Sequence, residues 1–507
     1  MVDKIALNKF AFCMNSNTSE KLDSNINVNI IWISSDENVA KVDKEGTVTA
    51  IKEGFATITA KTKKNGVASC IVNVDFQVQN PILPSNWSVF IPDGEPHVWG
   101  DGNLYVYGSK DGVLKHFCSS DYHVIHTSNL INWTDAGVSY STEDNDTVPY
   151  PNAIMWAPDC MYLNGKYYLY TWFEDGEYPD NPFVVTSDKP EGPFEKFTQL
   201  KTSGSNELLV GGDPGAFLDD DGKAYLYWGS PMAAQLSEDG TKVIESTMTN
   251  LHSQLPDFFE GVSMRKRDGI YYLIYAQNFG KRTPENISPT NLAYAMGSSP
   301  LGPFEYKGVI ISNHGYQGAA NIHGSIEKFK GQWYVFYHKP RNGIWNKRVA
   351  CVEKIKFNDD GTIDQVEMTS SGCETGLLPN YKIDAEIACE LSGNCRFAEQ
   401  GSYNGIISSI KNGDYAVYKY INFGDGVTDF TANVTCSSNA SQIEIRLDSF
   451  DGEIVGICDV PNDNSSGFVQ VKCSVYKAKG IRAVYLVFTG CDDDNLFNID
   501  WFKFDTL

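Results

Sequence analysis

Residues 101–107 of the chain read DGNLYVY, a Gly-containing turn followed by a short, Tyr-rich strand. The pattern occurs four more times, as NGKYYLY (164–170), DGKAYLY (221–227), DGIYYLI (268–274) and KGQWYVF (330–336). Successive copies start 63, 57, 47 and 62 residues apart, close to the length of one propeller blade with long loops. The repeat predicts an all-β fold in which residues 82–375 form a five-bladed β-propeller, the alternative being a generic β-meander.

The segments on either side of the repeat also read as strands. Apolar and polar residues alternate between turns within residues 1–78, for example in residues 26–30 and 46–50, as in a small β-sandwich. The strand pattern restarts after residue 379 and predicts a further β-rich part over 381–507. We therefore expect a central propeller between two smaller β-rich parts.

Composition excludes several functions. The chain has 41 Lys and Arg against 64 Asp and Glu, a net charge of −23, so a nucleic-acid backbone would be repelled. No apolar run approaches 18 residues, which argues against a membrane span. The 12 cysteines show no C-x-x-C spacing, so neither a zinc site nor a disulfide framework is indicated.

Acidic residues recur at a similar offset before the repeats. The innermost strand of a propeller blade lines the central channel, so residues just before each repeat are expected to meet at the axis. Those positions, five to eight residues upstream, are Glu95, Asp159, Asp213, Glu260 and His323. Carboxyl groups crowded in one funnel separate in pKa, which supplies both a proton donor and an ionised carboxylate. Glycoside hydrolysis needs that pair.

At these positions the chain resembles glycoside hydrolase family 43. The matching motifs are EPHV (95–98), WAPD (156–159), GDPGAFLDDDG (212–222), FEGVSM (259–264) and IHGS (322–325). The resemblance implies that Glu260 is the general acid and that Asp159 orients it and raises its pKa. It also implies that Asp213 and His323 line the sugar site, with His323 beside a calcium or water site.

The general base departs from the family pattern. The family has an Asp followed by Pro at this position, whereas this chain has Glu95 followed by Pro96. Glu95 is the favoured base, and Asp93, two residues earlier on the same strand face, is the alternative. The resemblance implies inversion, for which the acid and base carboxyl groups should lie about 6.5–9.5 Å apart.

Other residues near these acids are candidates for holding sugar. Trp156 and Phe259 could stack on a sugar ring or simply pack the channel wall. Arg341, just after the fifth repeat, is either a ligand for a sugar hydroxyl, as the resemblance implies, or part of a surface ion pair. His97 is expected to be a packed strand residue.

The flanking modules carry resemblances of their own. Residues 31–62 resemble the bacterial immunoglobulin-like domain of group 2, which implies a spacer or adhesion role. NGDYAVYKYINF (412–423) and LFNIDWFKF (496–504) resemble carbohydrate-binding module family 6. That resemblance implies a second β-sandwich, of the jelly-roll type, over 381–507. It also implies that Asn498 binds sugar and that Glu386 and Asp500 hold a structural calcium. The usual stacking aromatic is replaced by Ser409, and Tyr403 or Phe468 could substitute for it.

Together these features predict a glycoside hydrolase that removes terminal arabinofuranosyl or xylosyl residues from plant cell-wall polysaccharide such as arabinoxylan. The alternatives are an exo-β-galactanase or arabinanase on the same fold, or a non-catalytic, lectin-like propeller. No cofactor is expected for the chemistry. We expect a monomer that acts outside the cell, with its signal peptide absent from this sequence.

Overall fold

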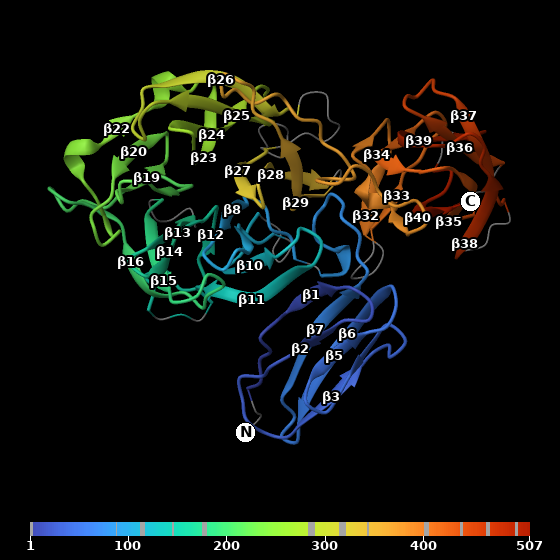
Figure 1. Ribbon diagram of the computed structural model, residues 1–507, viewed down its shortest axis with the longest axis horizontal. Coiled ribbons are helices and arrows are strands. Elements are labelled where there is room, and N and C mark those ends of the chain that lie inside the picture. Colours follow the sequence, from blue (N-terminus) through green and yellow to red (C-terminus); the bar gives the residue numbers. More distant parts are fainter. Residues whose placement is uncertain are drawn as a thin grey trace.

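The protein is an all-β molecule with three parts along the chain (Figure 1). Its structure, a computed structural model, describes residues 4–87, 89–111, 117–143, 145, 147–174, 180–281, 289–313, 321–341, 344–399, 405–436, 440–462, 467–491 and 495–506. Helical structure in these residues is confined to 3-10 turns, η1 (Ser85–Trp87), η2 (Glu245–Thr247), η3 (His252–Gln254) and η4 (Ala385–Ile387). None of the helices described is long or apolar enough to cross a membrane.

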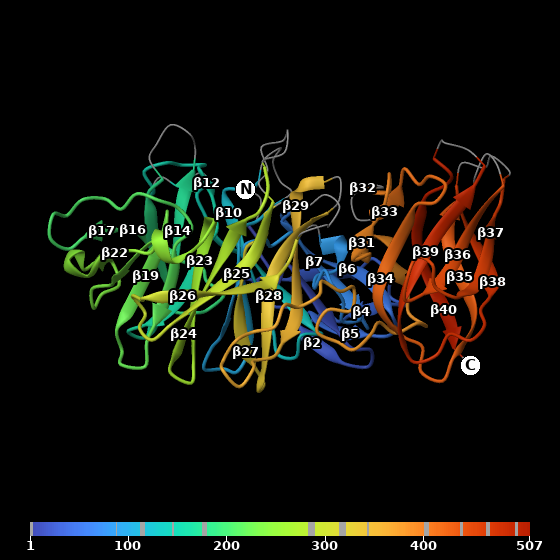
Figure 2. The same ribbon diagram turned by 90° about the horizontal axis from the view of Figure 1, so that it is seen from above.

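The central part contains five antiparallel groups of strands in chain order (Figures 1 and 2). The first group contains β8 (Glu95–Val98), β9 (Leu104–Tyr107), β10 (Asp121–Thr127) and β11 (Trp133–Ser141). The second group contains β12 (Ile154–Met155), β13 (Asp159–Leu163), β14 (Lys166–Glu174), β15 (Pro182–Ser187) and β16 (Glu195–Gln199). The third group contains β18 (Gly215–Leu218), β19 (Ala224–Trp228), β20 (Met232–Gln235) and β22 (Thr249–Asn250). The fourth group contains β23 (Phe258–Arg267), β24 (Ile270–Asn278), β25 (Thr290–Gly297) and β26 (Phe304–Ile311). The fifth contains β27 (Gly324–Phe329), β28 (Gln332–Arg341) and β29 (Ile344–Ile355), while β17 (Lys201–Thr202) and β21 (Lys242–Val243) form a small parallel pair.

The repeated turns connect the first and second strands of these groups. Asn164 and Gly165 both have positive φ, 51° and 80°, and join β13 to β14 as a two-residue hairpin. Asp268 with Gly269 does the same between β23 and β24. Such turns match the twist of the strands but need left-handed backbone, which explains the recurrent Asn-Gly and Asp-Gly pairs.

The Tyr-rich second strands are buried on both faces. Residues Leu104–Tyr107 of β9 and Ala224–Trp228 of β19 are entirely buried, because side chains on each face pack against a neighbouring group of strands. The first strands contact one another in the order β8, β13, β18, β23, β27 and back to β8. The apolar core between the fifth and first groups includes Phe336 and Val106, so packing continues around the whole circle.

The N-terminal part, for which the sequence predicts a small β-sandwich over residues 1–78, contains two sheets. One of its sheets contains β3 (Ile30–Ser34), β6 (Gly54–Thr62), β7 (Val67–Val74) and β1 (Ala11–Met14), and the other contains β2 (Ser19–Lys21), β5 (Thr47–Ala50) and β4 (Ala40–Val42). Strand β1 also pairs with β11, with Ala11 opposite Asp135. Backbone hydrogen bonds therefore make the first sheet continuous with the first group of the central part.

The C-terminal part has two sheets around one core. The first contains β31 (Glu390–Leu391), β34 (Tyr415–Asn422), β39 (Ile481–Gly490), β36 (Ser441–Leu447) and β37 (Ile454–Val460). The second contains β32 (Arg396–Glu399), β33 (Gly405–Ser408), β40 (Ile499–Thr506), β35 (Val427–Thr435) and β38 (Phe468–Ser474), with β30 (Ile383–Asp384) paired to β40. In the core between them the ring of Phe430 lies tilted against Phe502 and edge-on to Phe504.

Candidate active site

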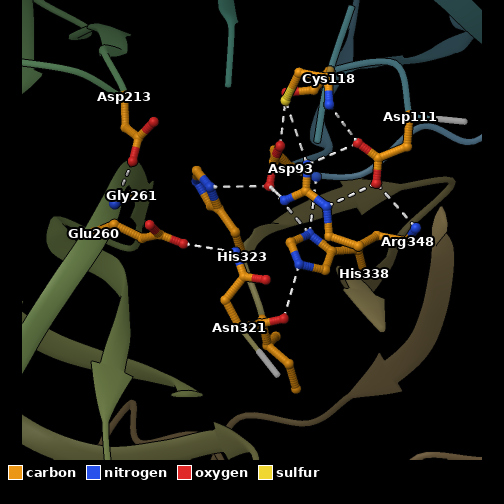
Figure 3. A network of polar contacts seen from close by, with 12 residues as sticks. Asp93, Asp111, Cys118, Asp213, Glu260, Gly261, Asn321, His323, His338 and Arg348 are labelled. Carbon is orange, nitrogen blue, oxygen red and sulfur yellow. Dashed lines mark hydrogen bonds and ion pairs between the residues drawn. The ribbon is translucent and has the colours of Figure 1, made fainter. Parts of the chain in front are cut away.

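Four titratable residues gather where the first strands of different groups begin or pass (Figure 3). Asp93 and Asp213 each lie two residues before their strands, β8 and β18, and His323 immediately precedes β27. Glu260 lies within β23, where the register with β24 shifts on both sides of it. Asp93 and His323 are only 3% and 5% exposed, whereas Asp213 and Glu260 are partly exposed.

Asp93 is held as a carboxylate by surrounding donors. Arg348 Nη1 donates to its Oδ1 at 2.9 Å, and Ser109 Oγ donates to Oδ2 at 2.6 Å. Burial alone would raise its pKa, but the Arg348 charge, His323 and His338 lower the pKa of Asp93 well below its usual range. The backbone of Asp93 has a φ of 57°, an uncommon conformation for a non-glycine residue. Asp93 therefore remains ionised at neutral pH.

Arg348 is fixed in turn by Asp111. Its Nε donates to Asp111 Oδ2 at 2.9 Å and its Nη2 donates to Oδ1 at 3.0 Å, a bidentate pair that is fully buried. The backbone N–H of Cys118 also donates to Asp111 Oδ1 at 2.9 Å. The guanidinium is thus held with Nη1 directed at Asp93.

Glu260 has the opposite electrostatic character. Burial and the nearby negative charge of Asp213 raise its pKa to about 7, against a lowering contribution from a hydrogen bond to Asn321. That hydrogen bond runs from Asn321 Nδ2 to Glu260 Oε1 at 2.8 Å. A substantial fraction of Glu260 therefore carries a proton near neutral pH.

Asp213 is positioned beside Glu260 by two donors. Trp172 Nε1 donates to its Oδ1 at 3.1 Å, and the backbone N–H of Gly261 donates to Oδ2 at 3.3 Å. Burial raises the pKa of Asp213, His323 opposes this, and Asp93 adds to it. Like Asp93, Asp213 has positive φ, at 49°. Uncommon backbone at both carboxylates points to a functional constraint.

His323 lies among these carboxylates. Its Nδ1 is 3.6 Å from Asp93 Oδ1. Burial would lower its pKa, but Asp93, Asp213 and Glu260 raise it to about 9, so the cation is favoured. An imidazolium has no lone pair for a metal ion, so the metal-ligand role suggested by the sequence would require His323 to lose this proton. A Cβ on Gly261, which has a φ of 61°, would lie 2.5 Å from the ring, so only glycine fits beside it.

Glu95 and Asp159 are placed together in a second, deeper group. Both are the first residues of their strands, β8 and β13, and they are 3% and 0% exposed. Glu95 Oε2 accepts from Ser263 Oγ at 2.8 Å and from Arg265 Nη2 at 3.2 Å. Burial and Asp159 raise the pKa of Glu95 to about 7, against Arg265 and His323. His323 is thus within electrostatic reach of both groups.

Asp159 contacts residues other than Glu260. Its Oδ1 forms a 2.6 Å hydrogen bond with His97 Nε2, and its Oδ2 accepts from the backbone N–H of Ala216 at 2.7 Å. Among the described residues, one set of side chains converges as a metal site would, namely Glu95, His97 and Asp159. The guanidinium of Arg265 beside Glu95 makes this set unfavourable for a cation.

The aromatic residues predicted to contact sugar lie in different surroundings. Trp156 lies between Phe117 and Trp172, with ring centroids 6.1 and 6.0 Å away, and Trp172 is the residue that donates to Asp213. Phe259 is partly buried next to Glu260, at the register shift in β23. Arg341 ends β28, and its side chain lies outside the described residues.

The predicted residues of the C-terminal part lie around β40. Asn498 precedes this strand, and its Oδ1 accepts from Asn495 Nδ2 at 3.2 Å. Glu386 in η4 is buried and accepts from the backbone N–H of Gly405 at 3.3 Å. Asp500 in β40 accepts from Asn433 Nδ2 at 2.8 Å. Strand β40 contacts η4, so Glu386 and Asp500 come from neighbouring elements. Their carboxylate oxygens are of the type that calcium prefers as ligands.

The residues considered for stacking on sugar in the C-terminal part differ in their exposure. Phe468 starts β38 and is partly buried, and Ser409 is exposed. Tyr403 lies outside the described residues.

Sequence reasoning missed Asp111, Asn321, His338 and Arg348. The last two are in β28 and β29, away from the offset that identified the acids. Their one sequence signal was unusual residue type, because charged residues rarely occupy strands that are buried on both faces. His338 and Arg348 are 0% and 1% exposed.

With this geometry established, the chain can be compared with known proteins. The family model for glycosyl hydrolases family 43 matches residues 78–363, that for carbohydrate binding module (family 6) matches 387–506, and that for the bacterial Ig-like domain (group 2) matches 18–72. The three resemblances noted in the sequence are thereby confirmed.

Curated relatives extend over most of the chain. An arabinoxylan arabinofuranohydrolase from Bacillus subtilis is 30% identical over 80% of this chain and 88% of its own length. A xylosidase/arabinosidase from Thermoclostridium stercorarium is 30% identical over 82% of this chain and 97% of its own length. A crystal structure of a family 43 arabinoxylan arabinofuranohydrolase from Bacillus subtilis in complex with cellotetraose covers 84% of this chain and 97% of that one, at 27% identity and a TM-score of 0.46. The chain belongs to glycosyl hydrolase family 43 and is a glycosidase.

Proposed function

We propose that the protein removes terminal arabinofuranosyl or xylosyl residues from arabinoxylan-type polysaccharide with inversion of configuration. The observation that carries the proposal is the electrostatic difference between two neighbouring carboxyl groups. The pKa of Asp93 lies well below its usual range, whereas that of Glu260 is about 7. An acid that keeps its proton and a carboxylate that stays ionised are the two groups that glycoside hydrolysis requires.

In this proposal Glu260 is the general acid and Asp93 is the general base. Glu260 gives its proton to the glycosidic oxygen as the bond to the anomeric carbon breaks. Asp93 accepts a proton from the water that attacks the opposite face of the sugar. The cycle closes when the proton taken up by Asp93 returns to solvent and Glu260 is reprotonated. Asp213 keeps Glu260 protonated through its negative charge.

This assignment replaces Glu95 and Asp159 in the roles that the sequence favoured for them. Glu95 is neutralised by Arg265 and has a pKa of about 7, so it would be partly protonated when the acid is ready to react. The charges that most affect Glu260 belong to Asp213, His323 and Asp93 rather than Asp159. We propose that Glu95 and Asp159 stabilise the meeting point of the first strands.

For the architecture, we propose a five-bladed propeller between an immunoglobulin-like sandwich and a jelly-roll sandwich. The five strand groups, the circular order of contacts between first strands and the apolar core between the last and first groups support the propeller. In this arrangement the acids from separate blades meet at one end of the axis.

The choice of sugar follows from the relatives. Those above are named for arabinofuranose and xylose release, which favours arabinoxylan over galactan or arabinan for this chain. The C-terminal part would hold the enzyme on the polysaccharide through Asn498, with Glu386 and Asp500 around a structural calcium. A lectin-like propeller is disfavoured because sugar binding alone does not need a protonated carboxyl group beside an ionised one.

Turnover of a matched set of substrates tests the proposal. The purified chain is assayed on 4-nitrophenyl α-L-arabinofuranoside, β-D-xyloside and β-D-galactoside, and on arabinoxylan. We expect release of arabinose or xylose, with Glu260→Gln and Asp93→Asn each lowering kcat on arabinoxylan at least about 100-fold. Hydrolysis of the galactoside alone would overturn the sugar assignment. Unchanged turnover in either variant would overturn the assignment of that residue.

A further inference from the structure

A chain of hydrogen bonds links the acid and the base of the proposed reaction through two residues that sequence reasoning missed. The backbone N–H of Asp93 donates to His338 Nδ1 at 3.0 Å. His338 Nε2 hydrogen-bonds the backbone carbonyl of Asn321 at 2.9 Å. Asn321 Nδ2 then donates to Glu260 Oε1 at 2.8 Å. Figure 3 shows these four residues around His323, with Glu260 on one side of it and Asp93 and His338 on the other.

The partners fix the protonation of His338. Nδ1 accepts a hydrogen bond from the backbone N–H of Asp93 and so must carry a lone pair, whereas Nε2 faces a carbonyl oxygen and so must carry the hydrogen. This is the neutral imidazole tautomer. Burial lowers the pKa of His338, with Arg348 adding to this and Asp93 opposing it, in agreement with a neutral ring. His338 is 0% exposed and connects two backbone segments.

The partner of Glu260 fixes the position of the catalytic proton. Asn321 Nδ2 can only donate, so Oε1 of Glu260 must act as an acceptor in both protonation states. In the protonated acid, the hydrogen is therefore on Oε2, which is free to face the glycosidic oxygen. Rotation of the carboxyl group would break the hydrogen bond to Asn321.

We infer that Asn321 and His338 are positioning residues that orient the protonated oxygen of Glu260 and set its distance from Asp93. This inference rests on the proposed function. Inversion needs one water between the base and the sugar, so the two carboxyl groups must be held at a defined separation. His338 joins main-chain atoms of residues 93 and 321, and the side chain of Asn321 carries the link on to Glu260.

The dependence on leaving group distinguishes this role from a general effect on folding. A glycoside of an acidic phenol leaves with little help from an acid, whereas a sugar hydroxyl must be protonated. We therefore expect Asn321→Ala to lower kcat about 10- to 100-fold on arabinoxylan oligosaccharides but less than about 3-fold on the 4-nitrophenyl glycoside, with little change in KM.

A pH profile supplies a second readout. Glu260 faces Asp213 before β18, Asp93 before β8 and His323 before β27, all of which remain in the variant. The hydrogen bond from Asn321 favours the ionised form of Glu260, so its loss should move the alkaline limb of kcat to higher pH. His338→Asn keeps an acceptor near the Asp93 N–H and removes the donor to residue 321, so it should show the same leaving-group pattern.

The full-length chain is used throughout, with Asn129→Ala as a matched control. Asn129 is also half-buried and caps a turn through its Oδ1, away from the candidate active site. Equal losses of kcat on both substrates in Asn321→Ala, or no loss on either, would overturn the inference. A wild-type chain that hydrolyses neither substrate would instead overturn the proposed function and the inference with it.

Discussion

Replacement of Asp213 with Asn should move the alkaline limb of the pH profile to lower pH. The pKa of Glu260 rises from an ordinary 4.5 to about 7, and burial is the largest cause, with the charge of Asp213 second. We assign Asp213 less than half of this rise, so its removal should lower the pKa of Glu260 to about 6, a change of about 1.4 kcal/mol. Asn is nearly isosteric with Asp and keeps an oxygen for Trp172.

The size of the effect depends on pH. At pH 7.5 the protonated fraction of Glu260 should fall from about one quarter to about one thirtieth, whereas at pH 5 Glu260 remains more than about 90% protonated in both proteins. Any contact between Asp213 and substrate would add a loss that is equal at every pH. The position of the limb, rather than the height of the plateau, therefore reports the charge effect.

The assay is kcat/KM for an arabinoxylan oligosaccharide, whose leaving sugar hydroxyl needs protonation, between pH 4 and 9, compared for wild type, Asp213→Asn and Asp213→Glu. Asp213→Glu keeps the charge and should keep the limb near pH 7. An alkaline limb in Asp213→Asn that coincides with that of wild type would refute the role of Asp213 in raising the pKa of Glu260.

Three further perturbations separate the roles of the buried groups. Asp93→Asn should lower kcat by about 100-fold or more, whereas Glu95→Gln should change it less than about 10-fold, and the reverse order in a steady-state assay would return the base role to Glu95. Gly261→Ala should lower kcat/KM because its methyl group would collide with the His323 ring, and full activity would contradict the packing there. The pKa of Glu353 is raised by burial to about 8, above its unfolded value, so ionisation destabilises the fold as pH rises toward 8. The thermal midpoint of wild type should therefore fall more between pH 5 and 8 than that of Glu353→Gln, and equal falls would contradict this.

Much of the fold could be predicted because it is encoded in local pattern. Each repeat pairs a turn that needs left-handed backbone, such as Asn164-Gly165, with a strand that is largely buried. These features are visible in one dimension. The pairing of β1 with β11 could not be predicted from the sequence. The two strands are more than 100 residues apart, and the alternation of apolar and polar residues in β1 does not indicate which strand it pairs with.

The candidate site was predictable in its residue types but not in its depth. Counting back from the first repeat identified Glu95, which is the first residue of β8. Asp93 lies two residues before that strand. Asp213 has the same relation to β18, so Asp93 and Asp213 share a level, whereas Glu95 and Asp159 share the next level down. A difference of two residues along the chain therefore decides which carboxylates lie close together. The offset from each repeat is too coarse to distinguish these two levels.

Arg348 illustrates a different limit. It comes from the last strand of the fifth group and reaches Asp93, which lies just before the first strand of the first group. Nothing in the spacing of these two residues predicts that contact. The charge that keeps Asp93 ionised therefore depends on the packing of the fifth group against the first.

Proton NMR of the sugar during the first minutes of hydrolysis tests the pairing of Glu260 with Asp93 as acid and base. The spectrum is recorded before mutarotation equilibrates the anomers of the released arabinose or xylose. A water molecule activated by Asp93 attacks the face opposite the leaving group, so the first product should have the inverted configuration. First-formed sugar with retained configuration would require a carboxylate that attacks the anomeric carbon itself, and would contradict the assignment of Asp93 as a general base.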